Sequence, residues 1–368
     1  MKPLSLILAS AVLSCMLSGC NFRPLEDYAN VSYVRVYVNE SMLNVTTGFY
    51  DDSIREKTGG AVDVKFQRPD YAAPEILRVG LFDASTGELV TERYLRNQGD
   101  DDLGHYFDGY VTINPGTYNL VVYNFGTEST VIDSENNCFK MLAYTHEISP
   151  SIKTQLKTRS NSPEAYMNEI IRYDADPLFV ASAEGLVIPF HRELDTLRDV
   201  SGQPWFQSSS LVKCYYLQIG VIGAQYISSS ACLLTGMAES THTLEPDFEY
   251  SGETTLYFKM QQGVWPKGYR YGYDEFHCIY TTFGTFGCLP DAVKDLKVSL
   301  EFVTTYGAQI DTTFHLSTEF LRQDAIERQW ILPDFEIKIP PPPDAGQSDG
   351  GIAPSVDDWE EINSDLDI

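Results

Sequence analysis

Short runs of β-branched and aromatic residues recur along this chain, and clusters of glycine, proline and aspartate separate them. Val31–Val38 reads Val-Ser-Tyr-Val-Arg-Val-Tyr-Val and has the length of one strand. Val62–Phe66 alternates apolar and polar residues with period two, as a half-buried strand does. Pro115 and Gly116 predict a tight turn, and Thr117–Phe125 follows as a strand with aromatic residues at alternate positions.

The second half of the chain continues the pattern. Leu211–Ile222 alternates, and Thr254–Met260 and Leu296–Val303 are further strand-like runs. Residues 330–339 are expected to close the last sheet, with their proline marking an edge. Strands at this spacing with turns between them predict an all-β fold of packed sandwiches rather than alternating α/β layers.

A change of composition at residues 199–210 divides the chain into two units. This segment contains Gly202, Pro204 and three consecutive serines, which is typical of a domain boundary. We therefore expect an N-terminal β-sandwich over residues 31–198, a linker over 199–210 and a C-terminal β-sandwich over 211–339.

Residues 340–368 differ from everything before them. Four consecutive prolines lead into an acidic segment that has no Lys or Arg, so a disordered tail is predicted. One apolar stripe at helical spacing is formed by Val356, Trp359, Ile362 and Leu366. A solvated tail is the commoner case, and a segment that folds on a partner is the alternative.

The charge of the chain limits its partners. It has 26 Lys and Arg residues against 52 Asp and Glu residues, for a formal net charge of −26. Such a surface repels polyphosphates and anionic lipid headgroups. We therefore expect no nucleic-acid partner and no polybasic mode of membrane binding.

Residues 1–19 are predicted to be a secretory signal peptide, with one Lys before an apolar run that is too short for a permanent membrane span. The end of the run resembles a bacterial lipobox, in which cleavage occurs before a Cys that carries lipid. The matching residues are Leu17, Ser18, Gly19 and Cys20. The resemblance implies that the mature chain starts at Cys20, that acyl chains such as palmitate hold it in a membrane, and that residues 20–30 form a tether.

The residue after the lipobox bears on location. Asn21 stands where an inner-membrane retention signal would have Asp, so the resemblance implies the outer membrane, and the cell surface is the expected location. Cys15 is a poorer cleavage site because Leu13 would occupy a position that calls for a small residue. An ordinary cleaved signal peptide with incidental cysteines is the alternative.

Five cysteines remain once Cys15 and Cys20 are assigned to the signal region: Cys138, Cys214, Cys232, Cys278 and Cys288. Cys278 and Cys288 flank a glycine-rich segment that is interpreted as a turn, and they are the first candidate disulfide. Cys214 and Cys232 lie on neighbouring strand-like runs and are the second. Five small buried thiols are an equally good interpretation. The absence of a CxxC motif speaks against a zinc ribbon or a thioredoxin-type site.

Motifs that carry catalysis are missing. The sequence has no GxSxG, Walker or dinucleotide fingerprint, and its six histidines are scattered without an HxH or HxxxH pair. We expect no catalytic residue, no metal site and no cofactor. Asp100–Asp102 and Asp108 could bind calcium, but solvated acidic loops are far commoner. Trp265, Tyr269 and Tyr271 could form a sugar-stacking platform, or they could belong to the core.

Three features in order resemble a known family. They are the lipobox, the segment Pro115–Asn124, and Leu234–Met237 after a strand that begins Gln218-Ile-Gly. The chain is thereby similar to Bacteroidales lipoproteins of the FimB-like group, the anchors and minor subunits of type V fimbriae. The resemblance implies two tandem transthyretin-like β-sandwiches on the outer membrane and a role without catalysis. Subunits of these fimbriae join by strand donation, but the tail from Asp344 lacks the period-two apolar pattern of a donated strand.

The expected function is therefore that of a lipid-anchored surface protein: a fimbrial anchor, a minor fimbrial subunit or an adhesin. Its expected partners are the outer membrane, fimbrial subunits and ligands on host or bacterial surfaces. The alternative is a glycan-binding surface lipoprotein of a polysaccharide-uptake system. A hydrolase is a third and weaker hypothesis, because no carboxylate pair stands out among so many acids.

Overall fold

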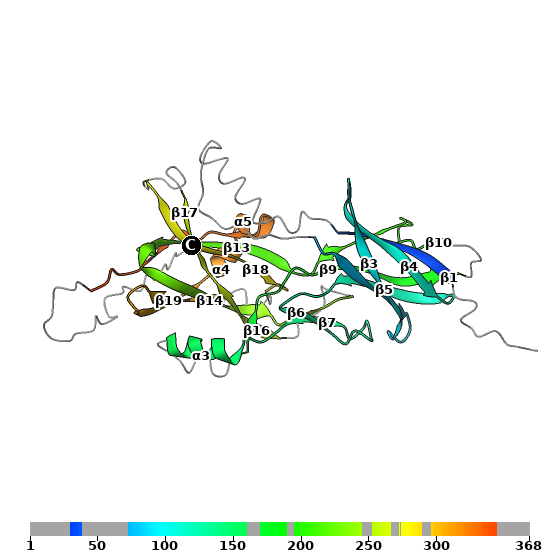
Figure 1. Ribbon diagram of the computed structural model, residues 1–368, viewed down its shortest axis with the longest axis horizontal. Helices are drawn as coiled ribbons and strands as arrows, with labels where there is room; N and C mark the ends of the chain where they lie inside the picture. The colour runs from blue at the N-terminus through cyan, green and yellow to red at the C-terminus, as the bar shows by residue number, and fades with distance from the viewer. Residues whose placement is uncertain are drawn as a thin grey trace, which may run out of the picture.

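The computed structural model describes residues 30–38, 73–159, 170–189, 195–244, 252–265, 272, 274–288 and 296–343. Two β-sandwiches lie one after the other along the long axis of the molecule (Figure 1). The prediction of an all-β sandwich fold is confirmed. The lipobox, residues 20–29 of the predicted tether, the strand predicted over Val62–Phe66 and the acidic segment after Pro343 lie outside the described residues. Asn30, the last residue of the predicted tether, belongs to β1.

A nine-stranded sheet forms the first sandwich. Its strand order is β10-β1-β4-β3-β2-β5-β9-β12, with β11 beside β1. The strands are β1 (Asn30–Val38), β2 (Ile76–Asp83), β3 (Leu89–Asp101), β4 (Gly104–Ile113), β5 (Gly116–Asn124), β9 (Phe179–Ile188), β10 (Asp195–Thr196), β11 (Phe206–Gln207) and β12 (Ser209–Ser210). Residues from both halves of this sheet meet in one apolar cluster, so the sheet curls until one face encloses the core.

Strand β1 shows how the period-two pattern builds this core. Val34 and Val36 are fully buried in the cluster, while Tyr33 and Arg35, at the alternate positions, face outward and are half-buried. The strand predicted over Val31–Val38 is thus confirmed.

Two five-stranded sheets form the second sandwich. One contains β13 (Lys213–Ile222), β17 (Gln261–Trp265), β18 (Phe276–Thr285), β21 (Trp330–Ile331) and β22 (Glu336–Lys338). The other has the order β20-β19-β14-β16-β8, with bounds Gln309–His315, Lys297–Thr304, Ile227–Ala238, Glu253–Lys259 and Ile171–Tyr173. Phe258 and Phe283 stack between the sheets, with ring centroids 4.7 Å apart, and anchor the apolar core there.

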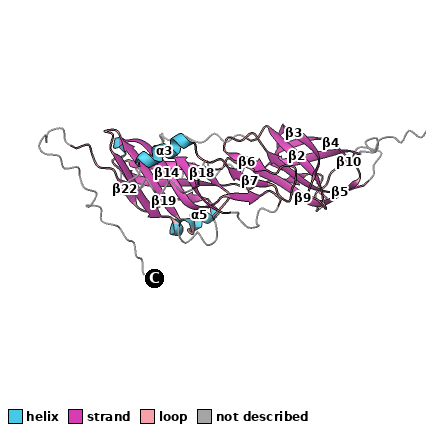
Figure 2. Cartoon of the chain, turned by 90° about the horizontal axis from the view of Figure 1, so that it is seen from below, coloured by secondary structure: helices cyan, strands magenta, loops and turns pink. Residues whose placement is uncertain are grey.

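Short helices cover the second sandwich. They are α3 (Pro150–Arg159), η3 (Ala224–Tyr226), α4 (Ser317–Phe320) and α5 (Gln323–Glu327). Figure 2 shows α3 and α5 on opposite sides of this sandwich. Within the described ranges, no helix combines the length and the apolar character that crossing a membrane requires.

The two sandwiches share chain segments. Strand β8 precedes β9 in sequence, yet it pairs in parallel with β16 of the second sandwich. Ile148 and Leu156, around α3, pack with Ile171 against the outer face of the same sheet, where Ala231 and Leu233 lie. A three-stranded sheet of β6 (Thr130–Asp133), β7 (Leu142–Thr145) and β15 (Ser240–His242) also joins the two halves. The chain therefore visits the second sandwich before β9 returns it to the first, and we call residues 146–178, between β7 and β9, the crossing segment.

The predicted boundaries did not anticipate this path. The predicted N-terminal sandwich includes residues 150–173, but α3 and β8 pack on the second sandwich. Residues 199–210, predicted as a linker, contain β11 and β12, which extend the first sheet. Both differences involve pairing between residues distant in sequence, which local composition does not reveal.

Candidate functional site

The lipobox residues Leu17, Ser18, Gly19 and Cys20 fall outside the described residues, so lipidation stays a prediction. Tyr269 and Tyr271 also fall outside them.

The five cysteines that the structure does describe are free thiols, so both disulfide predictions are wrong for this structure. Cys278 lies inside β18, and the seven strand steps from Cys278 to Thr285 cover roughly 23 Å. Three further residues cannot return Cys288 to within the ~7 Å that a disulfide allows between Cα atoms. What was interpreted as a turn between Cys278 and Cys288 is mostly extended strand.

Cys214 and Cys232, the second predicted pair, point into different parts of the core. Cys232 points into the core of the second sandwich, whereas Cys214 belongs to a different apolar cluster, at the junction of the two sandwiches. Burial raises the pKa of Cys214 to about 12 and that of Cys288 to about 11, so neither forms a reactive thiolate near neutral pH.

Trp265 is not part of a sugar platform. Its side chain is fully buried, and its indole Nε1 donates a hydrogen bond to Gln218 Oε1 at 2.7 Å. The Tyr216 hydroxyl donates to the same oxygen at 2.8 Å. The burial of Trp265 contradicts the stacking role predicted for it, because a ring without exposed surface cannot stack on a sugar.

The structure instead places aromatic residues on the outer face of β1 and β4. Tyr33 lies opposite Tyr110, and Arg35 lies opposite Asp108, in the antiparallel register of the two strands. We call the surface formed by Tyr33, Arg35, Tyr106, Asp108 and Tyr110 the tyrosine face. The ring centroids of Tyr33 and Tyr110 are 5.5 Å apart, and the Arg35 guanidinium lies 4.9 Å from the centroid of Tyr106.

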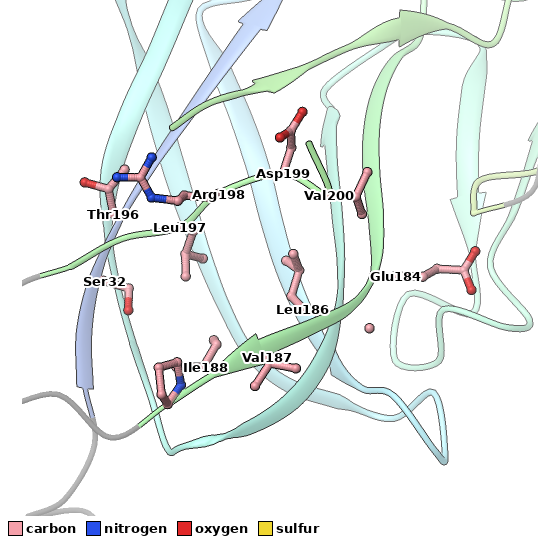
Figure 3. Close-up of a pocket in the computed structure, with 12 residues that line it drawn as sticks. Ser32, Glu184, Leu186, Val187, Ile188, Thr196, Leu197, Arg198, Asp199 and Val200 are labelled. Carbon is pink, nitrogen blue, oxygen red and sulfur yellow. The ribbon is translucent and has the colours of Figure 1, made fainter. Parts of the chain in front are cut away.

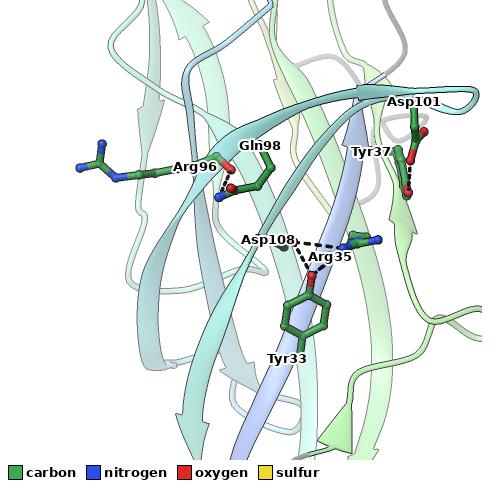
Figure 4. Close-up of polar contacts among 7 residues, drawn as sticks. All are labelled: Tyr33, Arg35, Tyr37, Arg96, Gln98, Asp101 and Asp108. Atoms are coloured by element: carbon green, nitrogen blue, oxygen red, sulfur yellow. Dashed lines mark hydrogen bonds and ion pairs between the residues drawn. The ribbon is translucent and has the colours of Figure 1, made fainter.

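Polar bonds fix the centre of the tyrosine face (Figure 4). Arg35 Nη2 donates to the Tyr33 hydroxyl at 2.8 Å and to Asp108 Oδ2 at 3.1 Å. The Tyr33 hydroxyl donates to the same carboxylate. Asp101, from the acidic loop that was weighed as a calcium site, accepts a bond from the Tyr37 hydroxyl at 2.9 Å. Among the described residues, no group of three or more His, Cys, Asp or Glu is placed to hold a metal ion.

The protonation states in this network are stable. Burial lowers the pKa of Arg35, but hydrogen bonds with Tyr33 and Asp108 outweigh it, so the net shift is upward. Burial, followed by the bond with Asp108, raises the pKa of Tyr33. The guanidinium therefore stays charged and the phenol stays neutral across physiological pH.

The sequence carried a signal for the tyrosine face. In Val31–Val38, the valines at even positions line the core, so period two places Tyr33, Arg35 and Tyr37 together on the other side. Tyr106, Asp108 and Tyr110 alternate in the same way. What local reasoning missed was that the two strands pair with these residues opposite one another.

A cavity of about 300 Å³ lies at one end of the first sandwich, between β9 and residues 196–200 (Figure 3). Leu186, Val187 and Leu197 contribute apolar side chains to its lining. Arg198 Nη1 donates to the Gly202 carbonyl at 3.1 Å. Hydrogen bonds, first of all from the Ser201 side chain, lower the pKa of Asp199. A carboxylate with a lowered pKa is unprotonated and weakly basic at neutral pH, so it is poorly suited to act as a general acid or as a general base.

The junction of the two sandwiches has its own apolar cluster. Val121 and Val180, from the outer face of the first sheet, meet Val212 and Phe286 of the second sandwich there. Arg172 of β8 forms an ion pair with Glu239 beside this cluster. These contacts fix how one sandwich sits on the other.

Two acids lie in the crossing segment of this junction. Asp176 Oδ2 accepts bonds from the Ser129 backbone N–H at 2.6 Å and from its hydroxyl at 2.8 Å. Burial raises the pKa of Asp174 to about 7, although the residue keeps part of its surface exposed. The Gly284 N–H, 3.4 Å away, partly offsets this shift, and the charge of Asp176 adds to it.

The fold and these surfaces define a tandem β-sandwich protein whose polar and aromatic groups lie on a sheet face and at a domain junction. A family model described as a domain of unknown function (DUF5119) matches residues 59–258, more than half of the chain. The protein belongs to this family. The matched segment includes α3 and β8 and extends into β16, so it covers the crossing between the sandwiches. No curated protein sequence matches the chain.

Solved structures similar to this chain include fimbrial proteins and adhesin candidates. A candidate adhesin from Bacteroides ovatus is 18% identical, with 89% of this chain and 95% of that chain covered and a TM-score of 0.48. The fimbrial anchor protein Mfa2 from Porphyromonas gingivalis is 11% identical, with coverage of 84% and 90% and a TM-score of 0.42. The C-terminally truncated tip fimbrial protein Mfa3 from the same organism is 12% identical, with coverage of 78% and 81% and a TM-score of 0.30.

Proposed function

We propose that this protein is a lipid-anchored structural protein of the outer membrane, exposed on the cell surface, that serves as a fimbrial anchor, a minor fimbrial subunit or an adhesin. We also propose that it is not an enzyme. Support comes from the lipobox that ends at Cys20, followed by two sandwiches joined through a buried junction.

The position of β1 is the observation that carries this proposal. Strands β1 and β10 lie at the end of the molecule away from the second sandwich (Figure 1). Ten residues lead from Cys20 to Asn30, and an extended chain of that length spans at most ~36 Å. Lipid on Cys20 would thus keep the first sandwich close to the membrane and leave the second to project outward.

The junction supports a mechanical role. An interface between domains of one chain ordinarily permits relative motion unless it is large and apolar. Here shared strands, an apolar cluster and an ion pair join the sandwiches. A rod of this kind suits a protein that transmits force between a membrane and a surface structure.

The lipid anchor is tested by labelling cells with a radioactive or clickable palmitate analogue. The wild-type protein and the Cys15→Ser variant should both carry label and sediment with the outer membrane. Cys20→Ser should lose the label and the membrane association. A labelled Cys20→Ser variant, or an unlabelled wild-type protein, would contradict the proposal.

The surface role is tested in intact cells. Protease added outside should digest the wild-type protein while a periplasmic marker survives. If the protein anchors fimbriae, the Cys20→Ser strain should release fimbriae into the medium, whereas the Cys15→Ser strain should retain them. Protection from external protease would place the protein on the inner face and refute surface exposure.

A further inference from the structure

We propose that the tyrosine face binds a neutral oligosaccharide. This site is separate from the lipid anchor and from the cavity beside β9, and it does not depend on a fimbrial role. It also differs in position from the platform expected at Trp265, which lies in the other sandwich and is buried.

The first support is the exposure of its rings on a rigid support. Tyr110 is 57% exposed, and Tyr33 and Tyr106 are half-buried with part of each residue at the surface. All three stand on paired strands, and the bonds among Tyr33, Arg35 and Asp108 hold the centre in place. A preorganised surface loses little conformational entropy when a ligand binds.

The second support is the alternation of apolar and polar groups along the strands. The Tyr33–Tyr110 pair comes first, the Arg35–Asp108 pair follows, and Tyr106 comes next beneath the Arg35 guanidinium. The four residue steps from Tyr33 to Tyr37 span roughly 13 Å, which is longer than one sugar ring. A pyranose has an apolar face of C–H groups and a rim of hydroxyls, so a short chain of such rings matches this order.

The polar centre fits hydroxyl groups in particular. A hydroxyl both donates and accepts, so it can bond with a carboxylate and a guanidinium without leaving either unsatisfied. Arg35 and Asp108 form an ion pair, so their charges balance. Both side chains stay partly exposed and can reach a ligand. A few placed polar groups beside aromatic surface are typical of small-ligand sites.

Charge favours a neutral ligand. The charge of Arg35 is already met by Asp108, and Asp101 lies nearby through Tyr37. The chain as a whole carries a formal charge of −26. Sulfated or uronic-acid glycans would therefore be repelled.

A protein partner fits this surface less well. Tyr, Trp and Arg are frequent at protein hot spots, but the centres of such interfaces are depleted of charged residues. Here an ion pair occupies the centre and the rings flank it.

The test is an array of immobilised neutral and acidic oligosaccharides, probed with the full chain solubilised in detergent. Affinity for the best neutral oligosaccharide is then measured by titration calorimetry with Tyr110→Ala and Tyr33→Phe. Tyr94→Ala is the matched control, because Tyr94 is 54% exposed on β3 of the same sheet but packs beside Phe125 instead. Circular dichroism confirms that each variant is folded.

We expect the wild-type protein and Tyr94→Ala to bind the same neutral oligosaccharide. Tyr110→Ala should lose at least tenfold in affinity. Tyr33→Phe, which keeps the ring but removes the hydroxyl that bonds with Arg35 and Asp108, should lose several-fold. Retention of acidic glycans alone, or of none, would overturn the proposal. Equal affinities of Tyr110→Ala and Tyr94→Ala would also overturn it. If the array shows no binding and Tyr110→Ala instead loses a fimbrial subunit that the wild-type protein binds, the tyrosine face is a protein interface.

Discussion

Asp174, at the junction of the two sandwiches, makes the stability of the protein depend on pH. Its carboxyl has a pKa of about 7 in the folded protein, chiefly because burial disfavours the charged form. In the unfolded chain the same group has its ordinary, much lower pKa. The stability that this group contributes is therefore complete at pH values below about 4 and is lost as the pH rises through 7.

Replacing Asp174 by Asn should remove this dependence. At pH 8 the Asp174→Asn variant is expected to be more stable than the wild-type protein by about 1–3 kcal/mol, since each unit of pKa corresponds to ~1.4 kcal/mol and the residue is partly exposed. Near pH 4 the two proteins should be equal. Urea unfolding at several pH values measures this.

Asp176→Asn is the control for this prediction. It weakens the bonds that the Asp176 carboxylate accepts from Ser129, so it should destabilise the protein at pH 8. A difference between Asp174→Asn and the wild-type protein that is independent of pH would contradict the assignment.

Trp265 tests core packing at the same scale. Because its side chain is fully buried and bonded to Gln218, Trp265→Ala should lose about 3–5 kcal/mol of unfolding free energy. The exposed Tyr94→Ala variant should stay within ~0.5 kcal/mol of the wild-type protein in the same urea titration. Equal stability of Trp265→Ala and the wild-type protein would contradict the burial of the Trp265 side chain.

Among the elements, β18 depends on a close approach to the crossing segment. The Ala175 N–H donates to the Gly284 carbonyl at 2.9 Å, and a Cβ on Gly284 would lie 2.0 Å from the Ala175 carbonyl oxygen. Gly284 therefore has no side chain because the backbone of another segment occupies that space.

Gly284→Ala should accordingly destabilise the protein by about 1–3 kcal/mol, as overpacking does. Gly109→Ala should have a smaller effect, because the added Cβ there meets the end of the Leu95 side chain, which can rotate. Thermal unfolding of both variants provides the comparison, and a larger loss for Gly109→Ala would refute the steric argument.

Elements with a local signal were predictable. Strand β5 (Gly116–Asn124) matches the run predicted over Thr117–Phe125, and β19 (Lys297–Thr304) matches Leu296–Val303. In both cases period two and turn residues determine the result over a few positions. Glycine near Cys288 misled the interpretation of β18, because glycine permits a turn but does not require one.

What the sequence did not predict depends on contacts between distant segments. The parallel pairing of β8 with β16, the burial of Trp265 and the joining of Tyr33 to Tyr110 each require knowledge of which strands become neighbours. A hydrophobic pattern defines the buried side of a strand but not the element that covers it.

At the scale of the whole molecule, the crossing segment makes the two sandwiches interdependent. Residues 211–339 alone lack β8 and α3, which cover Ala231 and Leu233. This fragment should be aggregation-prone or poorly structured. The full chain should unfold in one transition, because the second sandwich takes β8 and α3 from the N-terminal half and covers the apolar residues Val121 and Val180 on the outer face of the first sheet.

Limited proteolysis and circular dichroism of the 211–339 fragment measure this. The matched control is the same fragment mixed with a separate peptide of residues 146–173. The added peptide should restore protection from protease. A stable, cooperatively folding 211–339 fragment on its own would show that the crossing segment is dispensable.

The crossing segment also has a consequence for biogenesis. Ile170, just before β8, accepts a bond from Thr254, which lies 84 residues later in the sequence. In the export that the proposed function requires, β8 must therefore remain unpaired until the strand it joins has emerged from the translocon. Over that interval the nascent polypeptide exposes apolar surface to the periplasm, which makes it a natural client for holding chaperones and an early target for quality-control proteases.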